Sequence, residues 1–133
     1  MKISFRALIL FSLAPFAASA EDVTKLSGID LAVQTHKWEG KTVETTAMCF
    51  YADINEYRCS SPHGARIDFS TLEPEAARKS IEANCDTIGK LLRPACKVRF
   101  RFVYERYDVQ SNGSGDEMHI VVAKGNTGTI VGK

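Results

Sequence analysis

The residues most able to do chemistry in this chain are four cysteines, Cys49, Cys59, Cys85 and Cys96. A Cys-x-x-Cys spacing would favour redox chemistry, and zinc-ribbon spacing would favour a metal centre. The sequence has neither pattern. We therefore predict two structural disulfides, Cys49–Cys59 between adjacent antiparallel strands and Cys85–Cys96 between a helix end and the next strand. A redox pair and a metal site are the alternatives.

Acidic, basic and histidine side chains suggest weaker chemistry. The loop at 108–117 faintly resembles a calcium loop, but its twelfth position is His119 rather than a bidentate carboxylate. The three histidines are scattered, and no serine stands in a nucleophile elbow. Two enzymatic sites can also be considered. A site for a metal and a phosphate would use Asp68, Glu73, Arg99 and Arg101. A carboxylate pair for sugar hydrolysis would come from Asp53, Glu56, Asp116 and Glu117. Solvated, cross-strand paired charges are the simpler interpretation, so we expect no enzyme, no cofactor and no metal.

The N-terminus has the pattern of an export signal. Lys2 and Arg6 precede an apolar run over Ala7–Phe16, and Ala18-Ser19-Ala20 has the small-x-small form of a signal-peptidase site. We predict a signal peptide over 1–20 and a mature chain from Glu21 in an oxidising compartment, the periplasm or the exterior. An uncleaved membrane anchor is the alternative.

Length and charge limit the partners. Without residues 1–20 the chain has 113 residues, which suits one domain. The leader holds two of the 17 basic side chains and none of the 16 acidic ones, so the mature charge is about −1. That balance argues against nucleic acid as a partner. No later apolar stretch approaches the ~20 residues of a membrane span.

Hydrophobic patterning predicts five strands and one helix. An N-terminal extension over 21–40 precedes a domain over 41–124 and a flexible tail over 125–133. A stripe with three-to-four-residue spacing runs from Ala77 through Cys85 to Leu92 and predicts a helix of about four turns. The predicted strands cover 42–52, 57–60, 65–70, 97–107 and 118–124, with a polar loop over 108–117.

The strand at 97–107 alternates most clearly. Phe100, Phe102 and Tyr104 occupy one side, as core residues do, and three basic residues occupy the other, Lys97, Arg99 and Arg101. This basic stripe is either a solvated face or a contact for an anionic partner.

Five strands with a helix between the third and fourth are the order of the OB-fold, a small Greek-key barrel. The segments Trp38–Val43, Tyr51–Cys59 and Ala65–Phe69 resemble the opening strands of small exported bacterial OB-fold proteins. These proteins are distant relatives of tRNA-anticodon-binding OB domains. The resemblance spans residues 29–124 and implies an interaction module with no catalytic residues.

An OB barrel binds across its second and third strands and the flanking loops. The resemblance therefore implies a ligand-binding surface that includes Tyr51, Asp53, Asn55, Tyr57, Arg58, Arg66, Asp68 and Asn112. We expect a non-enzymatic binding module of the bacterial envelope, whose partner is an oligosaccharide, a peptide or protein, or another anionic molecule. The alternatives are an assembly partner or the receptor-binding subunit of a secreted toxin, and then a small secreted hydrolase. The oligomeric state stays open.

Overall fold

The computed structural model describes residues 21–53, 56–62, 64–90 and 92–132. The predicted signal peptide and Asn55 lie outside them. The chain is mainly β. Its elements are β1 (Thr24–Lys25), η1 (Asp30–Ala32), α1 (Thr35–Trp38), β2 (Thr42–Asp53), β3 (Glu56–Ser60), β4 (Arg66–Asp68), α2 (Glu75–Asn84), η2 (Ile88–Lys90), η3 (Pro94–Cys96), β5 (Lys97–Ser111) and β6 (Glu117–Ile130).

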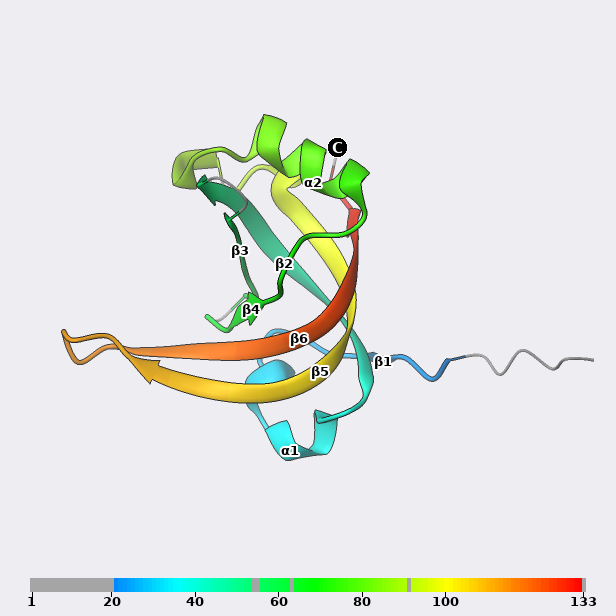
Figure 1. Cartoon of the computed structure of the whole chain (residues 1–133), viewed down its shortest axis with the longest axis vertical. Coiled ribbons are helices and arrows are strands. Elements are labelled where there is room, and N and C mark those ends of the chain that lie inside the picture. The colour runs from blue at the N-terminus through cyan, green and yellow to red at the C-terminus, as the bar shows by residue number, and fades with distance from the viewer. Residues whose placement is uncertain (1–20, 54–55, 63, 91, 133) are drawn as a thin grey trace, which may run out of the picture.

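The strands form one sheet whose hydrogen bonds close into a ring. β2 pairs with β3, β3 with β4, β6 with β5, and β5 with β2, all antiparallel, whereas β4 and β6 run parallel. The short β1 adds to β2 in parallel. In Figure 1, α2 covers one end of this ring and α1 lies near the other.

The core lies inside the ring and follows the alternation that the sequence predicts. Phe100, Phe102 and Tyr104 of β5 are buried, whereas Lys97, Arg99 and Arg101 are exposed. The Tyr104 hydroxyl donates to the Leu31 carbonyl at 2.8 Å, which ties the N-terminal extension to the core. The predicted two-sided character of this strand is confirmed.

The helix is shorter than predicted. α2 ends at Asn84, and its apolar face consists of Ala77 and Ile81. Cys85 leaves the helix, because its carbonyl accepts a hydrogen bond from the Tyr51 amide of β2 at 2.7 Å. Leu92, which the stripe placed on the apolar face, is 88% exposed. The segment beyond α2 instead folds into the two 3-10 turns, η2 and η3.

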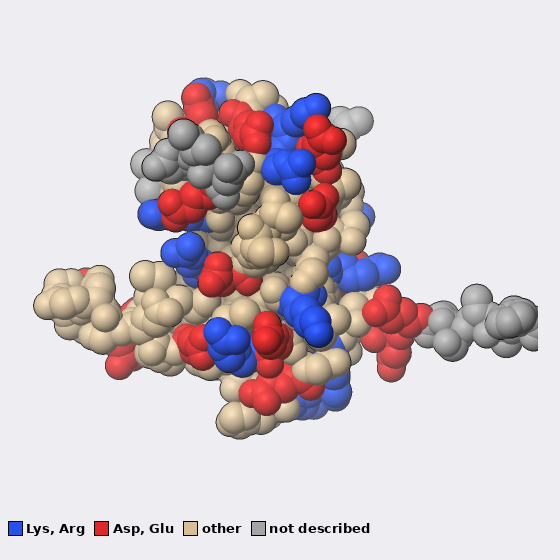
Figure 2. Space-filling model, in the orientation of Figure 1, with Lys and Arg blue, Asp and Glu red and all other residues tan. Residues whose placement is uncertain are grey.

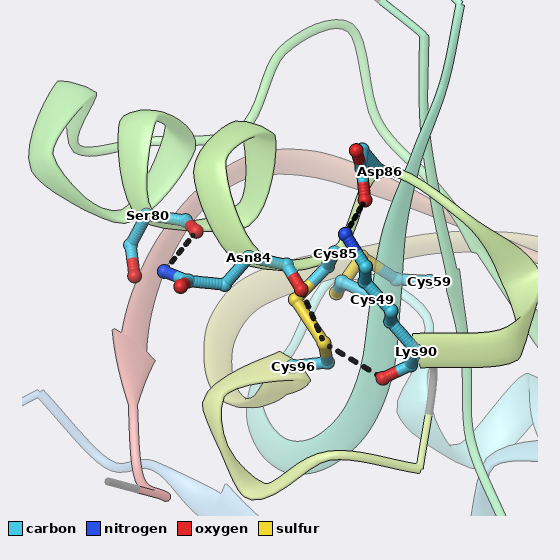
Figure 3. The surroundings of a disulfide bond; sticks show 8 residues. All are labelled: Cys49, Cys59, Ser80, Asn84, Cys85, Asp86, Lys90 and Cys96. Carbon is cyan, nitrogen blue, oxygen red and sulfur yellow. Dashed lines mark hydrogen bonds and ion pairs between the residues drawn. A yellow bond between two sulfur atoms is a disulfide. The ribbon is translucent and has the colours of Figure 1, made fainter.

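Both predicted disulfides are confirmed. Cys49 faces Cys59 in the β2–β3 register, with a Cα–Cα distance of 4.1 Å. The Cα atoms of Cys85 and Cys96 are 5.8 Å apart, and this disulfide links the two ends of the irregular segment between α2 and β5. Figure 3 shows both bonds beside the end of α2, where Lys90 pairs with Asp86. Among the described residues there is no free cysteine.

The last two strands are longer than predicted. β5 continues to Ser111 and β6 starts at Glu117, so residues 108–111 are strand rather than loop. β6 also runs on to Ile130, so most of the tail predicted as flexible over 125–133 is paired with the beginning of β5. In Figure 1 the far part of this hairpin extends away from the rest of the molecule. We call residues 107–119 the β5–β6 arm.

Candidate functional site

The predicted binding surface centres on the outer face of β3 and β4. Buried Cys59 and Ile67 are register partners and face the core. Because successive side chains of a strand point to opposite sides, Arg58 on β3 and Arg66 on β4 face outward. Asp68 follows Arg66 on the same side and is exposed. The structure therefore brings Arg58, Arg66 and Asp68 to one face.

Glu56 organises the two arginines. Its carboxylate lies 2.8 Å from the Arg58 guanidinium and 4.0 Å from that of Arg66. Glu56 was not among the predicted binding residues, although its spacing of two from Arg58 would place both on one strand face. We call Glu56, Arg58, Arg66 and Asp68 the β3–β4 cluster.

Arg66 retains unused hydrogen-bonding capacity. Its Nε is buried and has no hydrogen-bond partner in the described part of the chain. A guanidinium presents five N–H donors in a rigid fork, and a buried donor without a partner is costly. Because this atom is buried, a ligand at the surface would instead meet the exposed part of the Arg66 side chain, which is 28% exposed.

Two predicted tyrosines do not belong to this face. Tyr57 is only 8% exposed, and its hydroxyl donates to Glu82 of α2. Burial, followed by the interaction with Glu82, raises the pKa of Tyr57 above its ordinary value. The ring of half-buried Tyr51 packs 5.4 Å from that of Tyr57, against the core. The expectation that Tyr57 is exposed was wrong, because its position in β3 points inward with Cys59.

Asn112 lies elsewhere, at the tip of the β5–β6 arm. Its Oδ1 accepts hydrogen bonds from the Asp116 amide at 3.1 Å and the Ser114 hydroxyl at 2.7 Å. Side chains that bond their own local backbone in this way stabilise tight turns. Asn112 therefore shapes the hairpin turn and is separate from the β3–β4 cluster.

The acidic residues considered for sugar hydrolysis are also separated. β2 and β5 are antiparallel, with Thr42 opposite Val103 and Met48 opposite Lys97. Asp53 therefore lies beyond the start of β5, whereas the 112–116 turn lies beyond the start of β2. The two groups of acids therefore belong to opposite ends of the β2–β5 pairing.

The remaining chemical candidates are dispersed. Asp68 is on β4, whereas Arg101 on β5 pairs with Glu44 at 3.2 Å. His36 lies beside Glu39 on the surface, and His119 hydrogen-bonds Tyr107 at the base of the arm. Within the described ranges, no three His, Cys, Asp or Glu side chains are arranged to hold a metal ion.

Comparisons of the chain with protein-family models, with curated proteins and with solved structures find no match. None of the helices that the structure describes is long and apolar enough to cross a bilayer. Figure 2 shows acidic and basic side chains interspersed over the face in view, without a large area of one sign.

Proposed function

We propose that this protein is an exported binding module, without catalytic activity, built on an OB-like barrel. The order and direction of the strands support this. An OB barrel has five strands and a helix between the third and fourth, and β2 to β6 with α2 follow that order. The parallel β4–β6 pairing and the β2–β5 pairing join the ends of the set into a ring.

The proposed binding face is the β3–β4 cluster. β3 and β4 hold the positions of the second and third OB strands, which form the usual ligand face of that fold. The observation that carries this assignment is the pair of outward, part-exposed arginines that share the Glu56 carboxylate. Such donors suit a ligand rich in acceptor oxygens, an oligosaccharide or an acidic peptide.

The proposed location is the periplasm or the exterior of a bacterial cell. Two disulfides are consistent with folding in an oxidising compartment. The predicted signal peptide would deliver the chain there.

Calorimetry with the mature protein tests the binding proposal. The probes are neutral and acidic cell-wall oligosaccharides and acidic peptides, offered separately to the wild type and to Arg58→Ala, Arg66→Ala and Lys25→Ala. Lys25 is exposed on β1 and serves as the control for losing one positive charge.

We expect at least one probe to bind and each arginine variant to weaken it about tenfold or more, the loss of a charge-assisted hydrogen bond. Lys25→Ala should bind as the wild type does. Equal affinity for all four proteins would remove the site assignment, and no binding of any probe would contradict the proposed function.

A second candidate function is assembly with other subunits, and the β5–β6 arm favours it. The arm exposes two large apolar side chains, Val109 at 51% and Met118 at 37%. These residues lie on opposite faces of the arm, since Val109 pairs with His119 and Gln110 with Met118. Exposed apolar groups on a projecting ribbon are typical of a contact with another chain.

The mass in solution separates this candidate from a free binding module. Assembly predicts an oligomer that Val109→Lys dissociates, whereas Val33→Lys, at a similarly exposed position on the N-terminal extension, leaves it intact. A monomer of about 12–13 kDa, the mass of one mature chain, would exclude self-assembly.

A further inference from the structure

A second polar site lies on the outer surface of β2, β5 and β6. A depression of about 270 Å³ opens there, lined by Glu44, Arg99, Arg101, Thr127 and Thr129. The register explains the grouping, because Arg99 is the partner of Thr129 and Arg101 is the partner of Thr127. Glu44 is the partner of Arg101 on the other side. Three neighbouring strands thus contribute side chains to one hollow.

The charge of the depression is positive. Glu44 holds the Arg101 guanidinium at 3.2 Å and is itself largely buried. Arg99 forms no ion pair or hydrogen bond with any side chain in the described ranges. Lys97 lies on the same face of β5, two residues before Arg99. The lining side chains carry two positive charges and one negative charge, a net charge of about +1, which favours an anion.

A β-bulge borders the depression. Thr127 pairs with Arg101 and Lys124 pairs with Val103, so a three-residue interval on β6 lies opposite a two-residue interval on β5. Gly125, within the longer interval, has a φ of 63°, which glycine adopts without strain. A bulge bends its strand and re-aims the neighbouring side chains. The bend next to Thr127 is consistent with a hollow at this point instead of a flat ladder of side chains.

We propose that this depression binds a tetrahedral oxyanion, the phosphate group of a small molecule or of a lipid headgroup. Guanidinium forks match phosphate oxygens in a bidentate manner, and both arginines line the hollow. The hydroxyls of Thr127 and Thr129 can donate to the remaining oxygens. Glu44 fixes Arg101 in place and leaves Arg99 as the main anchor. This site lies on other strands than the β3–β4 cluster and does not depend on the function proposed for it.

The test compares inorganic phosphate with chloride at equal ionic strength, by backbone and arginine side-chain NMR of the mature protein. Phosphate should shift the resonances of residues 97–101 and 127–129. Arg99→Gln should weaken binding about tenfold, because a charge-assisted contact is lost. The control is Arg106→Gln on the other part of β5, where Arg106 pairs with Asp108 at 2.9 Å.

Thr129→Val separates a built site from diffuse attraction. Valine keeps the shape and the charge at this exposed position, so general electrostatic attraction would not change, whereas a hydroxyl that contacts phosphate would be lost. Its spectrum without phosphate also shows whether the variant folds. We expect weaker phosphate binding than in the wild type.

Vesicles identify the source of the phosphate. Phosphatidylcholine vesicles containing phosphatidic acid are compared with pure phosphatidylcholine vesicles in a sedimentation assay. Binding of inorganic phosphate assigns a small-molecule site, and Arg99-dependent sedimentation with phosphatidic acid alone assigns a headgroup site. Absence of both, or equal losses in Arg99→Gln and Arg106→Gln, overturns the proposal.

Discussion

Removal of either disulfide should lower the free energy of unfolding by about 3 kcal/mol. The two bonds join cysteines separated by 10 and 11 residues. In the chain-entropy model, closing loops of this size restricts the unfolded chain by roughly 3 kcal/mol each at 25 °C. The loops do not overlap in sequence, so the two contributions should add to about 6 kcal/mol.

That sum is large for a chain of this length. At about 0.05–0.15 kcal/mol per residue, a domain of 113 residues has a stability of roughly 6–17 kcal/mol. Loss of both disulfides would therefore remove a third or more of the total. The chain should fold poorly in a reducing compartment, which agrees with the predicted export.

Guanidinium unfolding followed by fluorescence measures this effect. Trp38 is the single tryptophan, and its indole N–H donates to the Asp30 and Val33 carbonyls, so its emission should change on unfolding. The proteins are the wild type and two double variants, Cys49→Ala with Cys59→Ala and Cys85→Ala with Cys96→Ala. A loss below about 1 kcal/mol in either variant would refute the loop-entropy argument.

Two further predictions concern packing and pH. Gly128→Ala should destabilise the fold by about 1–3 kcal/mol, because an added Cβ would lie 3.1–3.2 Å from Val98 and the Glu73 carbonyl. Gly113→Ala is the control, because a Cβ there meets open space and should lower stability far less. Thermal denaturation compares the two variants. In the folded protein, burial raises the pKa of Tyr57 and of Tyr104 above the ordinary value near 10, which both groups regain on unfolding. The contribution of these two groups to the free energy of unfolding should therefore be fully present below pH 10 and be lost as the pH rises further, because the phenols ionise more easily in the unfolded chain. Melting curves between neutral and strongly alkaline pH, with absorbance detection of phenolate, measure this. Phenolate formation by all tyrosines before unfolding would contradict it.

The sequence predicted the parts of the fold that depend on local pattern. The alternation of β5 and the positions of Cys49 and Cys59 follow directly from the two-residue period of strands. Both disulfides and the helix between β4 and β5 were therefore predictable.

Tertiary contacts decided the features that the sequence did not predict. The helical stripe continues through Cys85 to Leu92, but Cys85 bonds instead to β2 and to Cys96, and α2 ends. Gly125 and Gly128 suggested a flexible tail. In the structure Gly125 allows a bulge, and Gly128 leaves room for the Glu73 carbonyl, to which its amide donates at 2.6 Å.

The candidate site was predicted only in part, for a similar reason. Arg58, Arg66 and Asp68 lie on one face as expected, because their spacing sets their side of each strand. The inward direction of Tyr57 follows from the same two-residue period, which puts it on the face of Cys59. The distance of Asn112 depends on the unexpected length of the arm, which no local pattern encodes.

The most direct measurement of the central claim is a titration of isotope-labelled mature protein, observed at the arginine side-chain Nε–H resonances. The probe is the oligosaccharide or acidic peptide that binds most tightly in calorimetry. The account predicts that the Arg58 and Arg66 resonances both shift as the probe binds, while backbone shifts stay on β3 and β4. Saturable binding that leaves the Arg58 and Arg66 resonances unmoved and shifts another face would contradict it.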